Sequence, residues 1–390
     1  MQRPTVLLLA LAAQLASRPA FPMPPEVEAL ARQGQSHLYN LEFSEASAAF
    51  QQLRRLAPRH PAGPFLLGAA AWWKARYTFQ LPTGDSSRAV SKTLGEAAGL
   101  ARKLAASPAT ACEGKFFLGG ALGLQAHWEL LQGHYLTAAR EARESVRVLG
   151  ELESCTSYAD EARYGLGLYG YEASRLPWEM RWVSTFVIGG FSNKRDALVK
   201  LERAAEHARY VRSDAQAILA YVFSAYEPDA PRALAWAAKL RGERPDSPVA
   251  HTMVLEALSV GARFEELLVE SARDHARARE PGSSFASEAA TYRYFQGFAL
   301  LGLRRTDEAL EAFSAVVRME GRPVWIVSAL LRRGCAYDLL GRRKEALADY
   351  RAAPRRRDAW GQARRAKKYL TRPFTWKDLP GDLGPRGSAL

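Results

Sequence analysis

The sequence predicts an all-α fold built from repeated pairs of antiparallel helices, and three observations support this. One spacing recurs: a glycine, an alanine 12 residues later, and an aromatic residue 4 residues after that. The three copies are Gly34, Ala46 and Phe50; Gly297, Ala309 and Phe313; and Gly334, Ala346 and Tyr350. Helix-favouring residues dominate, and runs of alternating polarity are scarce. The chain has 390 residues with 48% hydrophobic and 24% charged residues, an ordinary soluble balance with room for a long array.

Small and aromatic residues at these offsets are what stacked helix pairs need. The small side chains let two helix backbones approach closely, and the aromatic ring fills the space towards the next pair. Weaker copies of the spacing fill the middle of the chain. We therefore predict about seven or eight helix pairs over residues 24–353, stacked as a right-handed α-solenoid.

The first repeat resembles a tetratricopeptide repeat (TPR). Its second helix is closed by Pro58, which follows Ala46 by 12 residues, and the last two copies resemble the same repeat. The resemblance implies that the first helix of each pair lines a concave groove. It also implies a non-catalytic scaffold that binds a protein or peptide partner in this groove.

The first residues are typical of an export signal. Met1, Gln2 and Arg3 give a short positive start, and the run from Val6 to Ala16 is almost wholly apolar. That run is too short to span a membrane. We expect residues 1–20 to be a signal peptide and the protein to be exported, periplasmic or secreted; a buried N-terminal helix is the alternative.

One place breaks the repeat period. Gly165 and Ala197 should be 12 residues apart within one repeat but are 32 apart, which predicts an insertion at about residues 172–191. Within it, Trp178, Trp182 and Phe186 recur every four residues and so share one face of a short helix.

A narrower resemblance covers residues 161–205. The run Gly165 to Tyr171, the Leu176-Pro177-Trp178 step and the Gly189-Gly190 pair are similar to two groups of repeat proteins. One is a set of exported bacterial TPR proteins, and the other is the eukaryotic inclusion-body clearance family. The resemblance carries no catalytic residues and implies a role in cell-envelope assembly or protein homeostasis.

Large aromatic residues of the first helices and of the insertion are the predicted partner-binding residues, since such rings offer stiff contact area. They are Tyr169, Tyr171, Trp178, Trp182, Phe186, Tyr292 and Phe295. Three alternatives stay open: the rings are core, the insertion is a lid over a lipid or small-molecule pocket, or it lies on a membrane.

The excess positive charge of +13 gathers near the C-terminus. Between Arg342 and Lys377 there are thirteen Lys and Arg residues against three acids. We expect a basic capping helix at residues 354–372 and a flexible tail at 373–390. The block is either a solvated cap or a contact for an acidic protein or an anionic membrane surface. The near-neutral remainder argues against a nucleic-acid partner.

The cysteines allow one disulfide, and the histidines and glycines match no metal-binding or nucleotide-binding motif in full. A disulfide between Cys112 and Cys155 is one possibility, and three thiols packed as small apolar groups is the other. No histidine falls in a zinc-binding pattern, although His127 and His134 lie seven residues apart. The Gly165-x-Gly167-x-x-Gly170 string lacks the preceding strand that dinucleotide binding needs. We expect no cofactor, no metal and no enzymatic activity.

Overall fold

The structure, a computed structural model, describes residues 24–78, 80–175, 193–319, 323–353 and 361–382. These ranges are predominantly helical and contain no strand, so the all-α prediction is confirmed. The helices of the first half are α2 (Pro25–Tyr39), α3 (Phe43–Leu56), α4 (Ala62–Thr78), α5 (Gly84–Ala105), α6 (Ala111–Leu131), α7 (Tyr135–Leu152), α8 (Ala159–Ser174) and α10 (Lys194–His207).

The second half follows the same plan. Its helices are α11 (Arg212–Ala225), α12 (Ala230–Glu243), α13 (Pro248–Val260), α14 (Phe264–Arg277), α15 (Ala289–Gly302), α16 (Thr306–Arg318), α17 (Pro323–Leu339), α18 (Arg343–Ala352) and α19 (Gln362–Thr371). Two short 3₁₀ helices, η1 (Ser284–Glu288) and η3 (Trp376–Asp382), are added to it. Within the described ranges no helix is long and apolar enough to cross a membrane.

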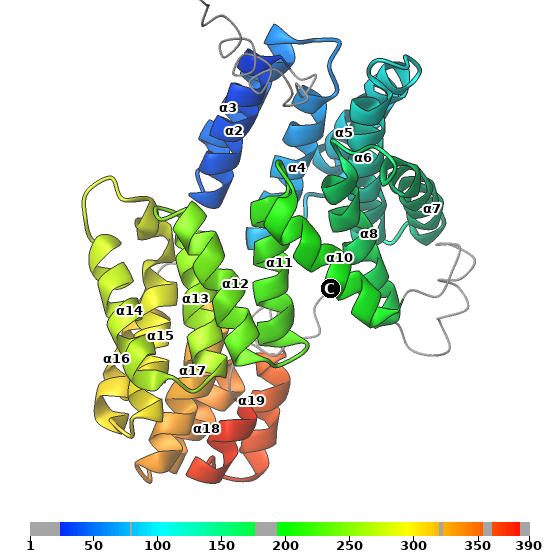
Figure 1. Ribbon diagram of the computed structural model, residues 1–390. Coiled ribbons are helices and arrows are strands. Elements are labelled where there is room, and N and C mark those ends of the chain that lie inside the picture. Colours follow the sequence, from blue (N-terminus) through cyan, green and yellow to red (C-terminus); the bar gives the residue numbers. More distant parts are fainter. Residues whose placement is uncertain (1–23, 79, 176–192, 320–322, 354–360, 383–390) are drawn as a thin grey trace, which may run out of the picture. The chain divides into compact units, whose positions relative to one another are not determined.

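The chain divides into two compact units. One contains Met1–Arg32, Ala49–Ala69 and Thr83–Arg203, and the other contains Gln33–Ala48, Ala70–Pro82 and Ala204–Leu390. In each unit, helices that follow one another in the sequence pack side by side, as α5, α6 and α7 do in the first and α11 to α18 do in the second. Figure 1 shows these neighbours as antiparallel pairs. The predicted pairing of consecutive helices is therefore confirmed.

The turns inside the helix pairs repeat one backbone geometry. In five pairs, a residue with positive φ ends the first helix, and the second helix begins two residues later. These residues are Leu41, Gly133, Ala262, Arg304 and Gly341. At each of them the next residue's N–H donates to a carbonyl five residues back, as Arg342 N does to Tyr337 O at 2.8 Å. This is the Schellman closure of a helix end, and its recurrence shows a structural repeat that is independent of the glycine spacing.

The recurring spacing is explained by contact between its members. A Cβ added to Gly297 would lie 2.8 Å from the ring of Phe313, and one added to Gly334 would lie 2.5 Å from the ring of Tyr350. Both rings are fully buried, as are Ala309 and Ala346. Since real Cβ atoms do not approach so closely, only glycine lets the two helices of each pair meet at this point.

The C-terminal end is more ordered than the sequence predicts. The buried ring of Tyr369 in α19 packs against Tyr350 and Phe374. The N–H of Phe374 donates to the carboxylate of Asp338 at 2.7 Å, and η3 follows. The predicted flexible tail at 373–390 is therefore wrong for residues 374–382, because apolar side chains within it complete the packing of α19.

Several predicted segments lie outside the described residues. They are the signal peptide at 1–20, most of the insertion at 172–191, part of the basic segment at 354–372 and the last residues of the tail. Helix α8 runs to Ser174 and α10 begins at Lys194, so the two helices enclose the predicted insertion.

Candidate functional site

Three of the predicted partner-binding rings lie in the core. Tyr171 and Tyr292 are fully buried and Phe295 is 1% exposed. Tyr292 packs against Phe285 of η1, and Phe295 meets the ring of Trp325 in α17 edge-to-face. These three residues present no surface to a partner, so the prediction that they line an open groove is wrong. For Tyr292 and Phe295 the physical reason is that α15 is apolar and buried on nearly every side.

Tyr169 is only half-buried, but its hydroxyl points into the protein. A Cβ added to Gly123 of α6 would lie 3.0 Å from this hydroxyl, and the Ser145 hydroxyl of α7 is close by. Burial raises the pKa of Tyr169, and the hydrogen bond with Ser145 opposes that rise. Tyr169 therefore joins three helices, and only part of its ring is available to a partner.

The remaining predicted residues, Trp178, Trp182 and Phe186, lie outside the described residues.

Within the second unit, the structure shows a long-range contact that the sequence did not indicate. The C-terminal ends of α2 and α4 pack on α11, α12, α13 and η1. The Tyr39 hydroxyl donates to Asp214 at 2.7 Å, and the Ser247 hydroxyl donates to the Tyr39 carbonyl at 2.7 Å. The Tyr77 hydroxyl donates to Glu288 of η1. Tyr39 and Tyr77 thus make contacts within the second unit with residues 175 and 211 positions later in the chain.

This contact has an apolar centre. Trp73 packs with its ring centroid 5.1 Å from that of Tyr39, against a cluster of buried residues. The cluster consists of Tyr39, Ala217, Leu240 and Ala250, with Val249 and Met253 at its edge. Arg244 lies over the Tyr39 ring at 4.2 Å. Ala217, Leu240 and Ala250 follow Tyr39 by roughly 180–210 residues, so no local repeat pattern could have revealed this contact.

The most chemically suggestive cluster is a buried histidine–aspartate pair beneath this contact. The His251 Nδ1 lies 2.8 Å from a carboxylate oxygen of Asp274, and Tyr292 packs nearby against Phe285. However, the Nε2 atom of His251 lies 3.0 Å from the backbone carbonyl of Pro245. The Arg277 guanidinium lies 3.5 Å from the same Nε2 atom, so protein groups contact both ring nitrogens. Both ring nitrogens are committed to holding α13 against α14 and the preceding turn.

Three other histidines also lie against carboxylates. His37 pairs with Glu42 and His134 pairs with Glu129, each at 2.6 Å across a helix-pair turn. His60 pairs with the buried Glu113 at 3.0 Å. Within the part of the chain that the structure describes, no three His, Cys, Asp or Glu side chains come together as metal ligands.

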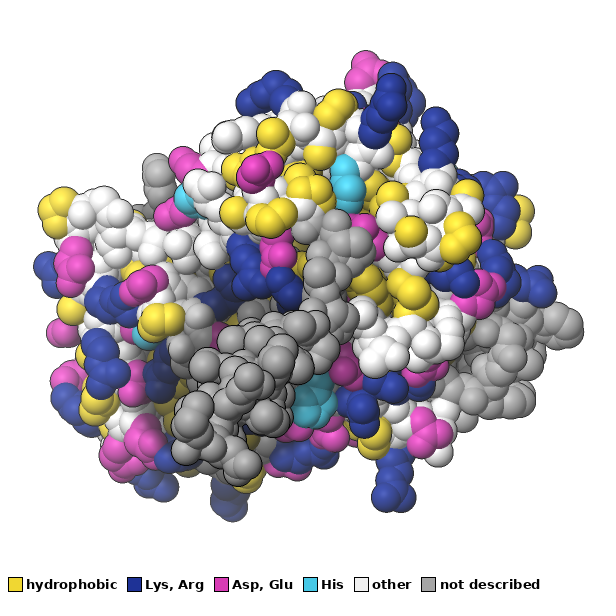
Figure 2. Space-filling view, turned by 45° about the horizontal axis from the view of Figure 1, so that its top comes forward, with side chains coloured by type: hydrophobic (Ala, Val, Ile, Leu, Met, Phe, Trp, Pro, Cys, Tyr) yellow, Lys and Arg dark blue, Asp and Glu magenta, His cyan; other side chains and the backbone are white. Residues whose placement is uncertain are grey.

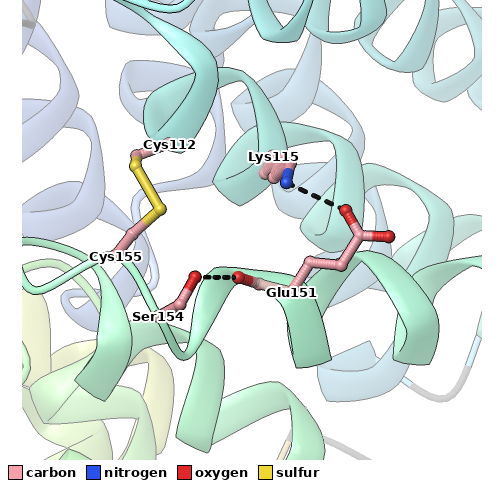
Figure 3. Close-up of a disulfide and its surroundings, with 5 residues drawn as sticks. All are labelled: Cys112, Lys115, Glu151, Ser154 and Cys155. Carbon is pink, nitrogen blue, oxygen red and sulfur yellow. Dashed lines mark hydrogen bonds and ion pairs between the residues drawn. A yellow bond between two sulfur atoms is a disulfide. The ribbon is translucent and has the colours of Figure 1, made fainter.

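The two cysteines singled out by the sequence are joined in the structure. Cys112, in the first turn of α6, forms a disulfide with Cys155, just after α7 (Figure 3). Beside it the Lys115 ammonium contacts the Glu151 carboxylate at 2.9 Å, which lowers the pKa of Glu151. The disulfide therefore ties together the open end of one complete helix pair. Cys335 is buried in α17.

The opposite end of the same helix pair carries an apolar tip that the sequence analysis missed. Leu136 is 90% exposed, Tyr135 is 70% exposed and Leu130 is 50% exposed. They flank the turn at Gly133, and we call these three residues the α6–α7 tip. Leucine on the outside of a helix pair is not a repeat signal, so only the structure distinguishes it from the core leucines. On the face shown in Figure 2, hydrophobic side chains gather in small groups among charges of both signs.

Comparison with known proteins identifies fold neighbours only. No protein-family model matches the chain. No curated protein matches it either. The similar solved structures include the APC/C hetero-tetramer Cut9–Hcn1, with 15% identity, 94% of this chain and 72% of that chain covered, and a TM-score of 0.32.

Two further structures are similar over most of the chain. The human IFIT1 dimer with PPP-AAAA has 17% identity and a TM-score of 0.31, covering 89% of this chain and 76% of that one. The P58(IPK) TPR domain has 16% identity and a TM-score of 0.24, covering 89% and 97%. Independently of these comparisons, the paired helices, the shared turn geometry and the glycine-on-aromatic contacts of the structure fit the TPR resemblance of the sequence.

Proposed function

We propose that this protein is an exported, non-catalytic helical-repeat scaffold that binds a protein partner. The observation that carries the proposal is the repeated pairing of helices through glycine-on-aromatic contacts and a common turn. Such arrays form an extended binding surface rather than one catalytic pocket. The contacts of both His251 ring nitrogens with protein groups support the non-catalytic part of the proposal.

Export is supported by two independent features. The N-terminal sequence is typical of a signal peptide. The bond between Cys112 and Cys155 is of a kind that persists in oxidising compartments. Together they favour a periplasmic or secreted location, where a role in cell-envelope assembly or protein homeostasis is our specific proposal.

The partner-binding residues that we propose are Trp178 and Trp182, with Phe186. The burial of Tyr171, Tyr292 and Phe295 removes them from this role. The alternative function, a lipid or small-molecule binding module with the insertion as a lid, uses the same segment. No described contact favours it over the scaffold.

The test is capture of cell-envelope proteins by the purified protein, compared with the Trp178→Ala/Trp182→Ala variant. We expect a defined partner with the original protein and at least a tenfold loss with the variant, since two aromatic anchors of a contact each contribute on the order of 2 kcal/mol. Leu56→Ala, at an exposed apolar residue of α3, is the control. Capture that is equal with both proteins, when circular dichroism shows that both are folded, would refute the site.

A further inference from the structure

The α6–α7 tip lies beside basic side chains on the same helix. From Leu136, the exposed residues Arg140, Arg143 and Arg147 follow at intervals of four, three and four along α7. This spacing places them on one face of the helix. The outer face of α7 is therefore an apolar end followed by a row of three arginines, about 11 Å from Arg140 to Arg147 at 1.5 Å per residue.

The acids at this end of the helix pair are turned away from the outer face. The side chain of Glu141 is 11% exposed whereas that of Arg140, its partner, is 75% exposed. The side chain of Glu129 is 10% exposed and contacts Ser91 and His134. These two acid side chains near the tip are thus withdrawn into the helix interfaces, whereas Glu151, at the far end of the row, is 42% exposed and pairs with Arg147 at 2.6 Å. The positive charge next to the tip therefore comes from Arg140 and Arg143.

The neighbouring helix adds to the same charge. The Ser87 and Ser91 hydroxyls of α5 meet Trp128 and Glu129 near the end of α6, which brings the start of α5 beside the tip. Lys92 is exposed there, and Arg88 is 74% exposed in an ion pair with Asp85. The tip is therefore bordered by basic side chains from two helices.

We infer that the α6–α7 tip and the arginine row of α7 form a docking face for an anionic lipid surface. The charge favours this occupant: arginine side chains pair with phosphate groups, and leucine and tyrosine insert at the level of the headgroups. The shape favours it as well. A leucine that is 90% exposed at the start of a helix projects outward, and a bilayer surrounds such a side chain on every side.

The other end of the helix pair makes this face stiff. The disulfide between Cys112 and Cys155 and the contact of Lys115 with Glu151 fix α6 to α7 at the end away from the tip. Insertion of the tip therefore costs little ordering of the chain. The inference goes beyond the proposed scaffold function and does not depend on partner capture.

The test is sedimentation of the purified protein with vesicles made of equal parts phosphatidylglycerol and phosphatidylcholine, and with vesicles of phosphatidylcholine alone. We expect binding to the anionic vesicles that weakens as salt is raised. Leu136→Asp is expected to weaken it about tenfold, because a leucine side chain no longer leaves water. Aspartate suits the first turn of a helix, so this variant should fold.

Arg143→Glu is expected to weaken vesicle binding by at least about tenfold, since it reverses a charge near the lipid surface. Matched controls are Val269→Asp, an exposed apolar residue of α14, and Arg59→Glu, an exposed arginine outside α7. Both controls should bind like the original protein.

Three results would overturn the inference. One is that the original protein does not bind anionic vesicles. Another is that Leu136→Asp and Arg143→Glu bind like their controls, which would place lipid contact elsewhere, for example on the basic α19. The third is that sedimentation velocity shows a dimer that Leu136→Asp abolishes, which would make the tip a contact between two copies of this chain. Loss of partner capture with intact vesicle binding would instead refute only the proposed function.

Discussion

The hydroxyl of Tyr39 donates a hydrogen bond of 2.7 Å to Asp214, 175 residues further along the chain. It joins the end of α2 to the start of α11 within one compact unit. Burial raises the pKa of Asp214, while the bond from Tyr39 and the charge of Arg244 oppose the rise. This hydrogen bond therefore helps to hold the C-terminal end of α2 against α11 within the second unit.

Replacement of Tyr39 by phenylalanine should lower the free energy of unfolding by about 1–3 kcal/mol, because the buried carboxyl group of Asp214 loses its donor. Urea denaturation followed by circular dichroism measures this change. Tyr135→Phe is the matched control, since Tyr135 is 70% exposed, and it should be neutral. Equal stability of the Tyr39 variant and the original protein would show that the bond does not form.

Because the pKa of Asp214 is raised, this residue should make the protein less stable as the pH rises. A carboxyl group whose folded pKa lies above its unfolded value binds more protons when folded. Its contribution is fully present below the unfolded value of about 3.8 and is lost as the pH rises through the folded pKa. Asp214→Asn should therefore remove a decrease in stability above about pH 4. Parallel unfolding curves for the two proteins from pH 4 to pH 8 would contradict this.

The glycine-on-aromatic contact predicts opposite effects of the same substitution at two glycines. Gly334→Ala should destabilise the protein by about 1–3 kcal/mol, because its Cβ would meet the buried Tyr350 ring, which Tyr369 holds in place. Gly95→Ala, in α5, has no atom within 4 Å of the new Cβ and should stabilise by about 0.5–1 kcal/mol. Thermal unfolding of the two variants decides the matter: equal shifts in melting temperature would mean that the helix pair does not close on Gly334.

The repeated turn geometry predicts that glycine at the positive-φ position of a turn makes the protein more stable. Ala262 has a φ of 52°, a conformation that costs a non-glycine residue about 1 kcal/mol or more. Ala262→Gly should stabilise the protein by up to about 1 kcal/mol, after the added freedom of the unfolded chain is subtracted. Gly341 has a φ of 72° at the equivalent turn, so Gly341→Ala should lower the free energy of unfolding by about 1 kcal/mol. Guanidinium unfolding midpoints that move in the reverse order would exclude the shared turn.

Removal of the disulfide should be costly because it closes a long loop. The separation of 43 residues between Cys112 and Cys155 encloses α6 and α7, for which chain entropy gives about 4 kcal/mol. Cys155→Ser should lower the free energy of unfolding by about 2–4 kcal/mol. Dithiothreitol should have the same effect on the original protein and little effect on the variant. A variant as stable as the original in oxidising buffer would mean that the cysteines are not bonded.

The local parts of the fold could be predicted from the sequence, and the long-range parts could not. Gly334, Ala346 and Tyr350 revealed a helix pair because all three lie within one repeat, where spacing dictates contact. The contact of Tyr39 with Asp214 left no trace, since neither residue belongs to the repeat pattern. Tyr292 and Phe295 were predicted to lie in an open groove, because the repeat spacing of α15 does not show that Phe285 of η1 and Trp325 of α17 cover these rings.

The site predictions also succeeded where residues lie one repeat apart and failed where exposure depends on the folded structure. The pairing of Cys112 with Cys155 was among the predictions because the two lie one repeat apart. The α6–α7 tip was missed because Leu136 has the same apolar character as a core leucine, and only its position after the turn at Gly133 exposes it.

The central claim of this account is that aromatic residues of α15 are closed off from a partner rather than open in a groove. Hydroxyl-radical footprinting of the free protein, read by mass spectrometry, tests it most directly. We predict that Tyr292 and Phe295 stay unmodified while Tyr135, in the same sample, is oxidised at the rate of an exposed tyrosine. Oxidation of Tyr292 and Phe295 at a rate comparable to that of Tyr135 would contradict the account and restore an open groove.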